Sequence, residues 1–139
     1  MRTVALILQL AAPLNPGFYI KIKNEPWMDL VIEDTHELGP NSLPVISVAH
    51  YSEQHGDLMR DPEMLFEMEK SDTEIMLTPF YWRNDYAGIE QYSASKVEGQ
   101  WIVNAKLRLD QLAFARTWDS NLRTQNFVAA FLRQQKGGI

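Results

Sequence analysis

Five ionisable side chains within one short segment are the main candidates for chemistry in this chain. The segment runs from Ser47 to Glu69, and the five residues are His50, His55, Asp57, Asp61 and Glu63. Imidazole and carboxylate groups bind zinc or non-haem iron when two or three of them converge. Their spacing here matches no metal motif, and residues 57–63 lack the alternating ligands of a calcium loop. We therefore expect no metal site and no cofactor, with His50 facing inward and hydrogen-bonded to backbone.

Acid–base catalysis by the same carboxylates is the second chemistry to weigh. It requires an Asp or Glu whose pKa is raised toward neutrality by burial, and a polar hairpin end is a poor place for burial. Ser47 or Ser52 could be paired with a histidine as nucleophile and base, but any chain of 139 residues permits such a pairing. The sequence has no Gly-x-Ser-x-Gly, phosphate-loop or dinucleotide-binding motif. We expect a non-enzymatic protein, and a small enzyme without a known motif is the alternative.

Turn formation explains the same segment without any chemistry. Gly56 can supply the positive φ of a hairpin turn, and Asp57 can hydrogen-bond its own backbone. Asp61 precedes Pro62 and can cap the turn where the next strand begins. Arg60 can pair with either aspartate, which contributes about 0–1 kcal/mol at an exposed site. The segment is therefore interpreted as a hairpin end.

A cluster of aromatic side chains near residues 80–92 is the best candidate for a contact surface. The cluster consists of Phe80, Tyr81, Trp82, Tyr86 and Tyr92. Neighbouring strand positions face opposite sides of a sheet, so these rings cannot all be core, and exposed rings anchor partners. Asp85 and Glu90 flank the cluster, which favours a protein partner over a nucleic acid. The expected partner-binding residues are Tyr51, Gly56, Asp57, Arg60, Asp61, Glu63, Tyr81, Trp82 and Tyr86.

Two other binding modes remain open. A nucleic-acid accessory factor would use Lys21, Lys23 and Arg83 with the aromatic rings as a stacking groove. An acidic decoy would imitate the charge of DNA, although a net charge of −5 is small for that role. Its carboxylates would be those of residues 53, 57, 61, 63, 67, 69, 72 and 74.

Length and composition describe one ordinary globular domain spanning residues 1–139. The chain is 45% hydrophobic and 22% charged, with a pI of about 5.1. The absence of cysteine favours a reducing, cytoplasmic setting. Arg2 and the residues after it imitate a signal peptide, but the apolar run covers only Val4 to Leu8. No run approaches the length of a membrane helix, so we expect no membrane association.

The hydrophobic pattern predicts strands in succession between two helical ends. Residues 3–12 are expected to form a buried helix, with a strand as the alternative, and Asp34–Leu43 a surface loop. The expected strands are Phe18–Lys23, Trp27–Glu33, Pro44–Tyr51, Met64–Glu69, Glu74–Trp82 with a break at Pro79, and Ile89–Ser95. The apolar sides of the first two can meet one core, which favours an antiparallel hairpin. The inward residues of the third and fourth are Ile46, Val48 and His50, and Met64, Phe66 and Met68.

The last third of the chain changes to helical periodicity. Apolar residues recur every three or four positions from Leu107, through Phe114, Trp118 and Leu122, with Asp110 or Asp119 near the start. Asn126 suits a helix end because Asn tolerates positive φ. A short helix over 127–135 and a frayed tail over 136–139 follow. The fold class expected is α+β, an antiparallel sheet of five or six strands with the helices on one face.

Three stretches of this sequence resemble a family of bacterial domains of unknown function. They are His50-Tyr51, Gly56–Met64, and Trp118-x-x-Asn121-Leu122-x-x-Gln125-x-Phe127, and the likeness runs from Gly17 to Phe127. Asn126 stands where relatives are expected to have glycine. The family looks common in plasmid, phage and integrative-element proteins. The resemblance implies an accessory role in mobile-element biology, against host defence or in transfer, and supplies no catalytic residues.

Overall fold

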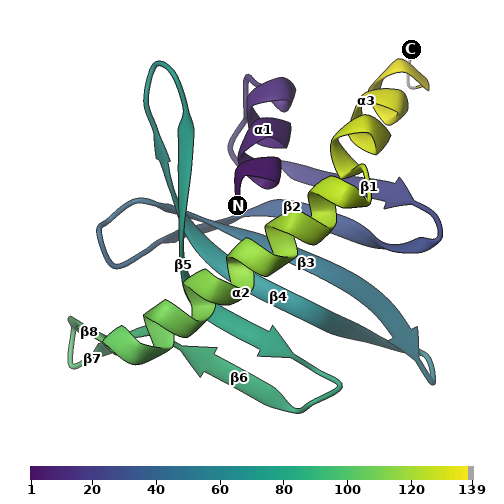
Figure 1. The fold of residues 1–139 in the computed structure, drawn as a ribbon. Helices are drawn as coiled ribbons and strands as arrows, with labels where there is room; N and C mark the ends of the chain where they lie inside the picture. Colours follow the sequence, from purple (N-terminus) through teal and green to yellow (C-terminus); the bar gives the residue numbers. More distant parts are fainter. Residues whose placement is uncertain (138–139) are drawn as a thin grey trace.

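The computed structural model describes residues 1–137 and contains one large sheet, one small sheet and three helices (Figure 1). The helices are α1 (Arg2–Ala11), α2 (Ala105–Thr124) and α3 (Phe127–Gly137). The strands are β1 (Tyr19–Asn24), β2 (Trp27–Leu38), β3 (Pro44–Gln54), β4 (Asp57–Lys70), β5 (Ile75–Asn84), β6 (Ile89–Tyr92), β7 (Ala94–Val97) and β8 (Gln100–Val103). The predicted α+β class and the helix at the N-terminus are confirmed.

The large sheet is an antiparallel meander in which β1 to β6 lie side by side in chain order. The three helices lie on one face of it (Figure 1). The residues that β3 and β4 contribute to the main core alternate as expected, with Ile46 and Val48 opposite Phe66 and Met64. The predicted break at Pro79 appears as a register shift, because Phe66 and Leu65 pair with Pro79 and Tyr81, which leaves Phe80 extra.

Several strands run further than their apolar patterns do, β2 and β4 by the largest number of residues. The expected loop over Asp34–Leu43 is wrong, because β2 continues to Leu38 and the loop covers only residues 39–43. Backbone pairing of Asp34 with Ile46 and of Leu38 with Pro44 carries the strand through polar side chains. β4 likewise begins at Asp57 and not at Met64. The β3–β4 turn is reduced to His55 and Gly56, which both have positive φ.

The main core lies between the sheet and the helices. Its helical part comes from Val4, Ile7 and Leu8 of α1, from Trp118 and Leu122 of α2, and from Phe127 and Phe131 of α3. The helix α1 is buried on one side only, because Leu6 and Leu10 on its other side are exposed. Phe114 is 37% exposed and lies at the margin of this core, so the predicted apolar stripe of α2 is buried only in part. Trp118 and Leu122 are buried as predicted.

Helix ends follow local capping chemistry. The helix α2 begins at Ala105 and is capped by Asn104, whose side chain accepts a hydrogen bond from the Leu107 N–H at 3.1 Å. The expected start near Asp110 or Asp119 is therefore wrong, because both lie inside the helix. Asn126 has φ of 62° between α2 and α3, as predicted for a helix-ending residue. The tail expected to fray begins in α3, which reaches Gly137, and its last two residues lie outside the described residues.

A second, smaller core covers one end of the opposite face of the sheet. β7 and β8 form a hairpin that the sequence pattern did not predict, joined by Glu98 and Gly99 at positive φ. This core contains Val45, Phe80, Tyr81 and Ala94, with Leu65 and Trp101 packed against it. We call this side of the sheet the helix-free face. The face continues over β1 to β4 without a helix.

The β1 edge of the sheet is closed by a side chain of α3. Gln134 accepts a hydrogen bond from the Lys23 N–H at 3.3 Å and donates one to the Lys21 carbonyl at 2.7 Å. The Phe18 carbonyl accepts a hydrogen bond from the Asp34 N–H of β2. Residues whose backbone groups face the partner strand alternate with residues whose groups face away, so those of Lys21 and Lys23 point away from β2. The amide of Gln134 therefore occupies the place of a further strand, which protects the edge from pairing with another chain.

Candidate functional site

Two distant turns meet at one end of the sheet and form what we call the two-turn surface. It consists of Ser52–Arg60 around the β3–β4 turn and Asp85–Gly88 at the β5–β6 turn. The two turns point to the same end of the molecule (Figure 1). The hydroxyl groups of Ser52 and Tyr86 lie 2.6 Å apart and share a hydrogen bond. Segments separated by about thirty residues in the chain thus form one continuous surface.

Asp85 holds the two turns together. Its carboxylate accepts hydrogen bonds from the Arg60 N–H at 2.7 Å and from Arg83 Nε at 2.6 Å. Its own N–H donates to the Arg60 carbonyl at 2.9 Å. Burial raises the pKa of Asp85, but the bonds from Arg60 and Arg83 lower it by more, so its pKa lies below the usual value. Asp85 therefore stays ionised and fixes the relative position of the turns.

Arg60 also extends the network to β4. Its Nε lies 3.4 Å from Glu63, and its Nη1 lies 3.6 Å from Asp85. Glu63 in turn accepts a hydrogen bond of 2.7 Å from the Ser47 hydroxyl on β3. Of the predicted residues, Arg60 and Glu63 thus belong to one polar network on the helix-free face. Gly56 and Asp57 lie beyond it at the exposed tip.

Three tyrosines of the helix-free face differ in exposure. Tyr81 is only 4% exposed and packs against Tyr92 with ring centroids 4.5 Å apart, so the expectation that Tyr81 is an exposed anchor is wrong. The β7–β8 hairpin beside it completes its burial. Burial raises the pKa of Tyr81 to about 12, and burial with the nearby Glu63 raises the pKa of Tyr51. These phenols therefore stay protonated at neutral pH and act as hydrogen-bonding groups.

Trp82 and Asp61 lie on the other side of the sheet. Trp82 is half-buried and meets Phe114 of α2 edge-on, with ring centroids 5.5 Å apart. Asp61 accepts a hydrogen bond of 2.7 Å from the side chain of Asn84, which shares the face of Trp82 by strand alternation. The structure thus divides the predicted surface. Tyr51, Arg60 and Glu63 lie on the helix-free face, and Trp82 and Asp61 do not.

The histidines and carboxylates of the first candidate segment do not converge. His50 is buried under α2 and α3, with ring centroids 5.5 Å from Trp118 and 5.7 Å from Phe127. His55 lies at the exposed hairpin tip, and Glu63 faces the opposite side from His50. Among residues 1–137, no three such side chains are placed to share a metal ion. The inward, backbone-bonded His50 is confirmed by its Nδ1, 3.2 Å from the Asp29 carbonyl.

The residues expected to form a nucleic-acid stacking groove or an acidic decoy are dispersed over the fold or bound to other side chains or backbone groups. Lys21 lies 3.6 Å from Asp29 on the outer strands, whereas Arg83 lies on β5 and is bound to Asp85. The cations expected to line a stacking groove are thus four strands apart. Among the carboxylates of the proposed decoy, Glu67 is buried and accepts three hydrogen bonds from Asn41 and Leu43.

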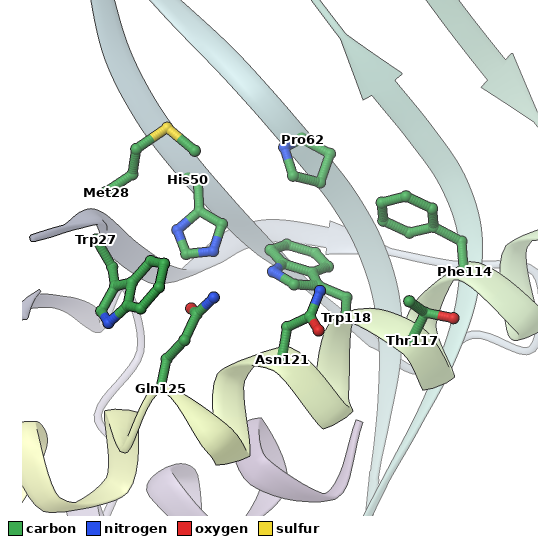
Figure 2. A pocket seen from close by; sticks show the side chains of 9 residues that line it. All are labelled: Trp27, Met28, His50, Pro62, Phe114, Thr117, Trp118, Asn121 and Gln125. Carbon is green, nitrogen blue, oxygen red and sulfur yellow. The ribbon is translucent and has the colours of Figure 1, made fainter.

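A separate pocket lies where α2 crosses the sheet (Figure 2). It has a volume of about 250 Å³ and is lined by Trp27, Met28, His50, Pro62, Phe114, Thr117, Trp118, Asn121 and Gln125. Segments that are far apart in sequence meet there, including parts of all three stretches that carry the family resemblance. The sequence does not predict this pocket. The spacing of apolar residues along α2 shows which side of the helix is buried, but it does not show which strand residues that side contacts.

Asp85 and Ser52 are the main contributors to the two-turn surface that sequence reasoning missed. In the sequence Asp85 only flanks the aromatic cluster, yet in the structure it is the residue that joins the turns. Its position one residue into a turn was a usable signal, because Asp at a turn start bonds to nearby N–H groups. Its partner on β4 could not be inferred without the strand register.

Comparison with known proteins places the chain in a family without giving it an activity. No curated protein and no solved structure gave a significant match. Among residues 1–137, no helix combines the length and apolar character needed to cross a membrane. The model of the DUF6908 family, described as a domain of unknown function, matches residues 2–128 and so includes α1, which lies outside the resemblance seen in the sequence. This chain therefore belongs to the DUF6908 family.

Proposed function

We propose that this protein is a non-enzymatic accessory protein that binds another protein through the two-turn surface. The observation that carries the proposal is the joining of the two turns by Asp85, Arg60, Ser52 and Tyr86. A surface fixed before binding loses little conformational entropy when a partner arrives, which favours affinity.

The side chains displayed by this surface suit protein recognition. Leu58 is 62% exposed and Tyr86 is 46% exposed, and both adjoin Ser52. A large apolar side chain and an amphipathic ring surrounded by polar groups are typical of interface anchors. Glu53 pairs with Leu58 across the two strands, and Asp57 precedes Leu58 in β4. Both carboxylates add negative charge at the rim. These features favour a partner with an apolar cleft and a basic rim.

The ionisation of the site also favours binding over acid–base catalysis. A general acid or base works best with a pKa near the working pH. On the two-turn surface the pKa of Asp85 is lowered, and on the helix-free face those of Tyr51 and Tyr81 are raised, so each moves away from neutrality. The groups keep fixed protonation states, which suits a recognition surface.

The biological setting rests on the family resemblance. In this proposal the protein belongs to bacterial mobile genetic elements such as plasmids and phages and acts in the cytoplasm against host defence. A small protein without catalytic machinery can oppose a defence system by covering a functional surface of one of its components. The lack of cysteine agrees with a reducing compartment.

Affinity capture from bacterial lysate with paired variants tests the proposal. Leu58→Glu should abolish recovery of a partner, whereas Met76→Glu, at an equally exposed position at the far end of β5, should leave it unchanged. Loss of the recovered material after nuclease treatment or in high salt would instead indicate a nucleic acid. Equal recovery with both variants would contradict the assignment of the surface.

A further inference from the structure

The pocket under α2 contains a hydrogen-bond donor that has no partner within the protein. Trp118 is 4% exposed, and its indole Nε1 is buried with no hydrogen-bond acceptor. An indole N–H can only donate, and a buried donor without an acceptor is unfavourable. Figure 2 shows the nitrogen of Trp118 on the side of its ring that faces His50 and Gln125. An acceptor from a bound molecule would satisfy this group.

His50 supplies a complementary acceptor on the same pocket. Its Nδ1 lies 3.2 Å from the Asp29 carbonyl, so Nδ1 carries the proton and donates it there. The remaining nitrogen, Nε2, then presents a lone pair. Burial lowers the pKa of His50, which keeps the ring neutral at physiological pH. The ring centroids of His50 and Trp118 lie 5.5 Å apart. The pocket therefore offers a ligand one acceptor, on His50, close to one donor, on Trp118.

The walls of the pocket restrict the kind of molecule that fits. Trp27, Met28, Pro62 and Phe114 give it apolar sides, and Figure 2 shows Trp27 across the pocket from Trp118. No Lys, Arg, Asp or Glu lines the pocket. A phosphate or carboxylate would lose its hydration there without a counter-charge. The amides of Asn121 and Gln125 can add hydrogen bonds to a neutral ligand.

We propose that this pocket binds a neutral, planar heteroaromatic ring that carries a hydrogen-bond acceptor beside a donor. Nucleobases and aromatic carboxamides share this chemistry. The acceptor takes the Trp118 N–H at the edge of that indole, the donor meets His50 Nε2, and the ring lies against Trp27 on the opposite wall. The site uses other residues than the two-turn surface, so it does not depend on the proposed protein binding.

Nuclear magnetic resonance of the indole N–H groups tests this proposal in the intact chain. The protein has four tryptophans, and Trp27 and Trp118 line the pocket whereas Trp82 and Trp101 do not. Titration with adenosine, and separately with nicotinamide, should shift the Trp118 signal downfield and leave that of Trp101 in place. A shift with one probe alone identifies nucleobases or carboxamides as the source. Absence of a Trp118 shift with either probe at millimolar concentration would overturn the proposal.

Matched variants separate the effect of the hydrogen bond from nonspecific hydrophobic binding of the probes. Trp118→Phe keeps an aromatic ring but removes the N–H, and should weaken probe binding about tenfold or more. Trp101→Phe should bind the probes as the wild type does. Should Trp118→Phe lose its native spectrum, Gln125→Ala at the pocket mouth should weaken binding in a folded protein. Unchanged affinity in both pocket variants would refute the site.

Discussion

Among the glycines of residues 1–137, Gly39 has the nearest side-chain neighbour, Glu67, and this pair allows a quantitative test. Glu67 is 3% exposed and organises the β2–β3 loop. Its carboxylate accepts hydrogen bonds from the Asn41 N–H at 2.8 Å, the Asn41 side chain at 2.9 Å and the Leu43 N–H at 3.3 Å. A Cβ placed on Gly39 would lie 2.4 Å from Glu67 Cγ and 2.7 Å from Cδ. Carbon atoms normally approach to about 3.5–4.0 Å, so a side chain at residue 39 displaces Glu67.

Both single substitutions should therefore destabilise the protein. Hydrogen bonds to a charged group contribute about 1.5–3 kcal/mol each, and the freed loop N–H groups can regain water. We expect Glu67→Ala to lower the free energy of unfolding by about 3 kcal/mol. Gly39→Ala should cost about 1–3 kcal/mol through overpacking. Once residue 67 is Ala, the clash is gone, and Gly39→Ala should then cost less than about 0.5 kcal/mol.

Urea denaturation followed by tryptophan fluorescence measures all four members of this double-mutant cycle. Equal slopes with denaturant concentration confirm that the compared states are alike. Glu69→Ala is the control, because residue 69 is exposed on the same strand and should change stability by no more than about 0.5 kcal/mol. The geometry predicts a coupling of about 0.5–3 kcal/mol between the two sites. Additive effects would refute the contact between Gly39 and Glu67.

Three further outcomes follow from particular contacts. Gln134→Ala should cost less than about 1 kcal/mol and should speed hydrogen exchange of the Lys23 N–H, measured by NMR; unchanged exchange would contradict the closed β1 edge. Asp85→Asn should speed exchange at the Arg60 N–H and loosen the two turns, at about 1–3 kcal/mol of stability. Burial lowers the pKa of His50, so the unfolded chain takes up its proton first as pH falls through about 6.5, and stability should fall with pH in that range. His50→Asn should flatten this dependence in denaturation experiments at pH 5–7.5, and an equal slope would argue against it.

The meander and its inward faces could be predicted because each strand carries its own alternating pattern. Ile46 and Val48, or Met64 and Phe66, identify the buried side without knowledge of any partner strand. Strand ends could not be predicted, because backbone pairing carries β2 through polar residues such as Asp34. The β7–β8 hairpin has a local signal in the sequence, the pair Glu98-Gly99 between two short strands. A residue followed by glycine is typical of a two-residue hairpin turn.

The candidate site was harder to predict because it depends on register. Arg60 and Glu63 belong to the predicted surface and share one polar network, whereas Tyr81, expected at the surface, is buried beside the β7–β8 hairpin, which the sequence pattern does not predict. Asp85 meets Arg60 only because β4 and β5 pair Glu63 with Arg83. One residue of slippage would send these side chains to opposite faces. The pocket under α2 requires the position of the helix on the sheet, which local patterns do not contain.

Site-specific photo-crosslinking in living bacterial cells tests the central claim most directly. A photoreactive amino acid replaces Tyr86 on the two-turn surface in one strain and Met76, which is 54% exposed at the far end of β5, in another. Protein binding through the two-turn surface predicts a discrete protein adduct from position 86 and none from position 76. No adduct from position 86, or the same adduct from both positions, would contradict the account.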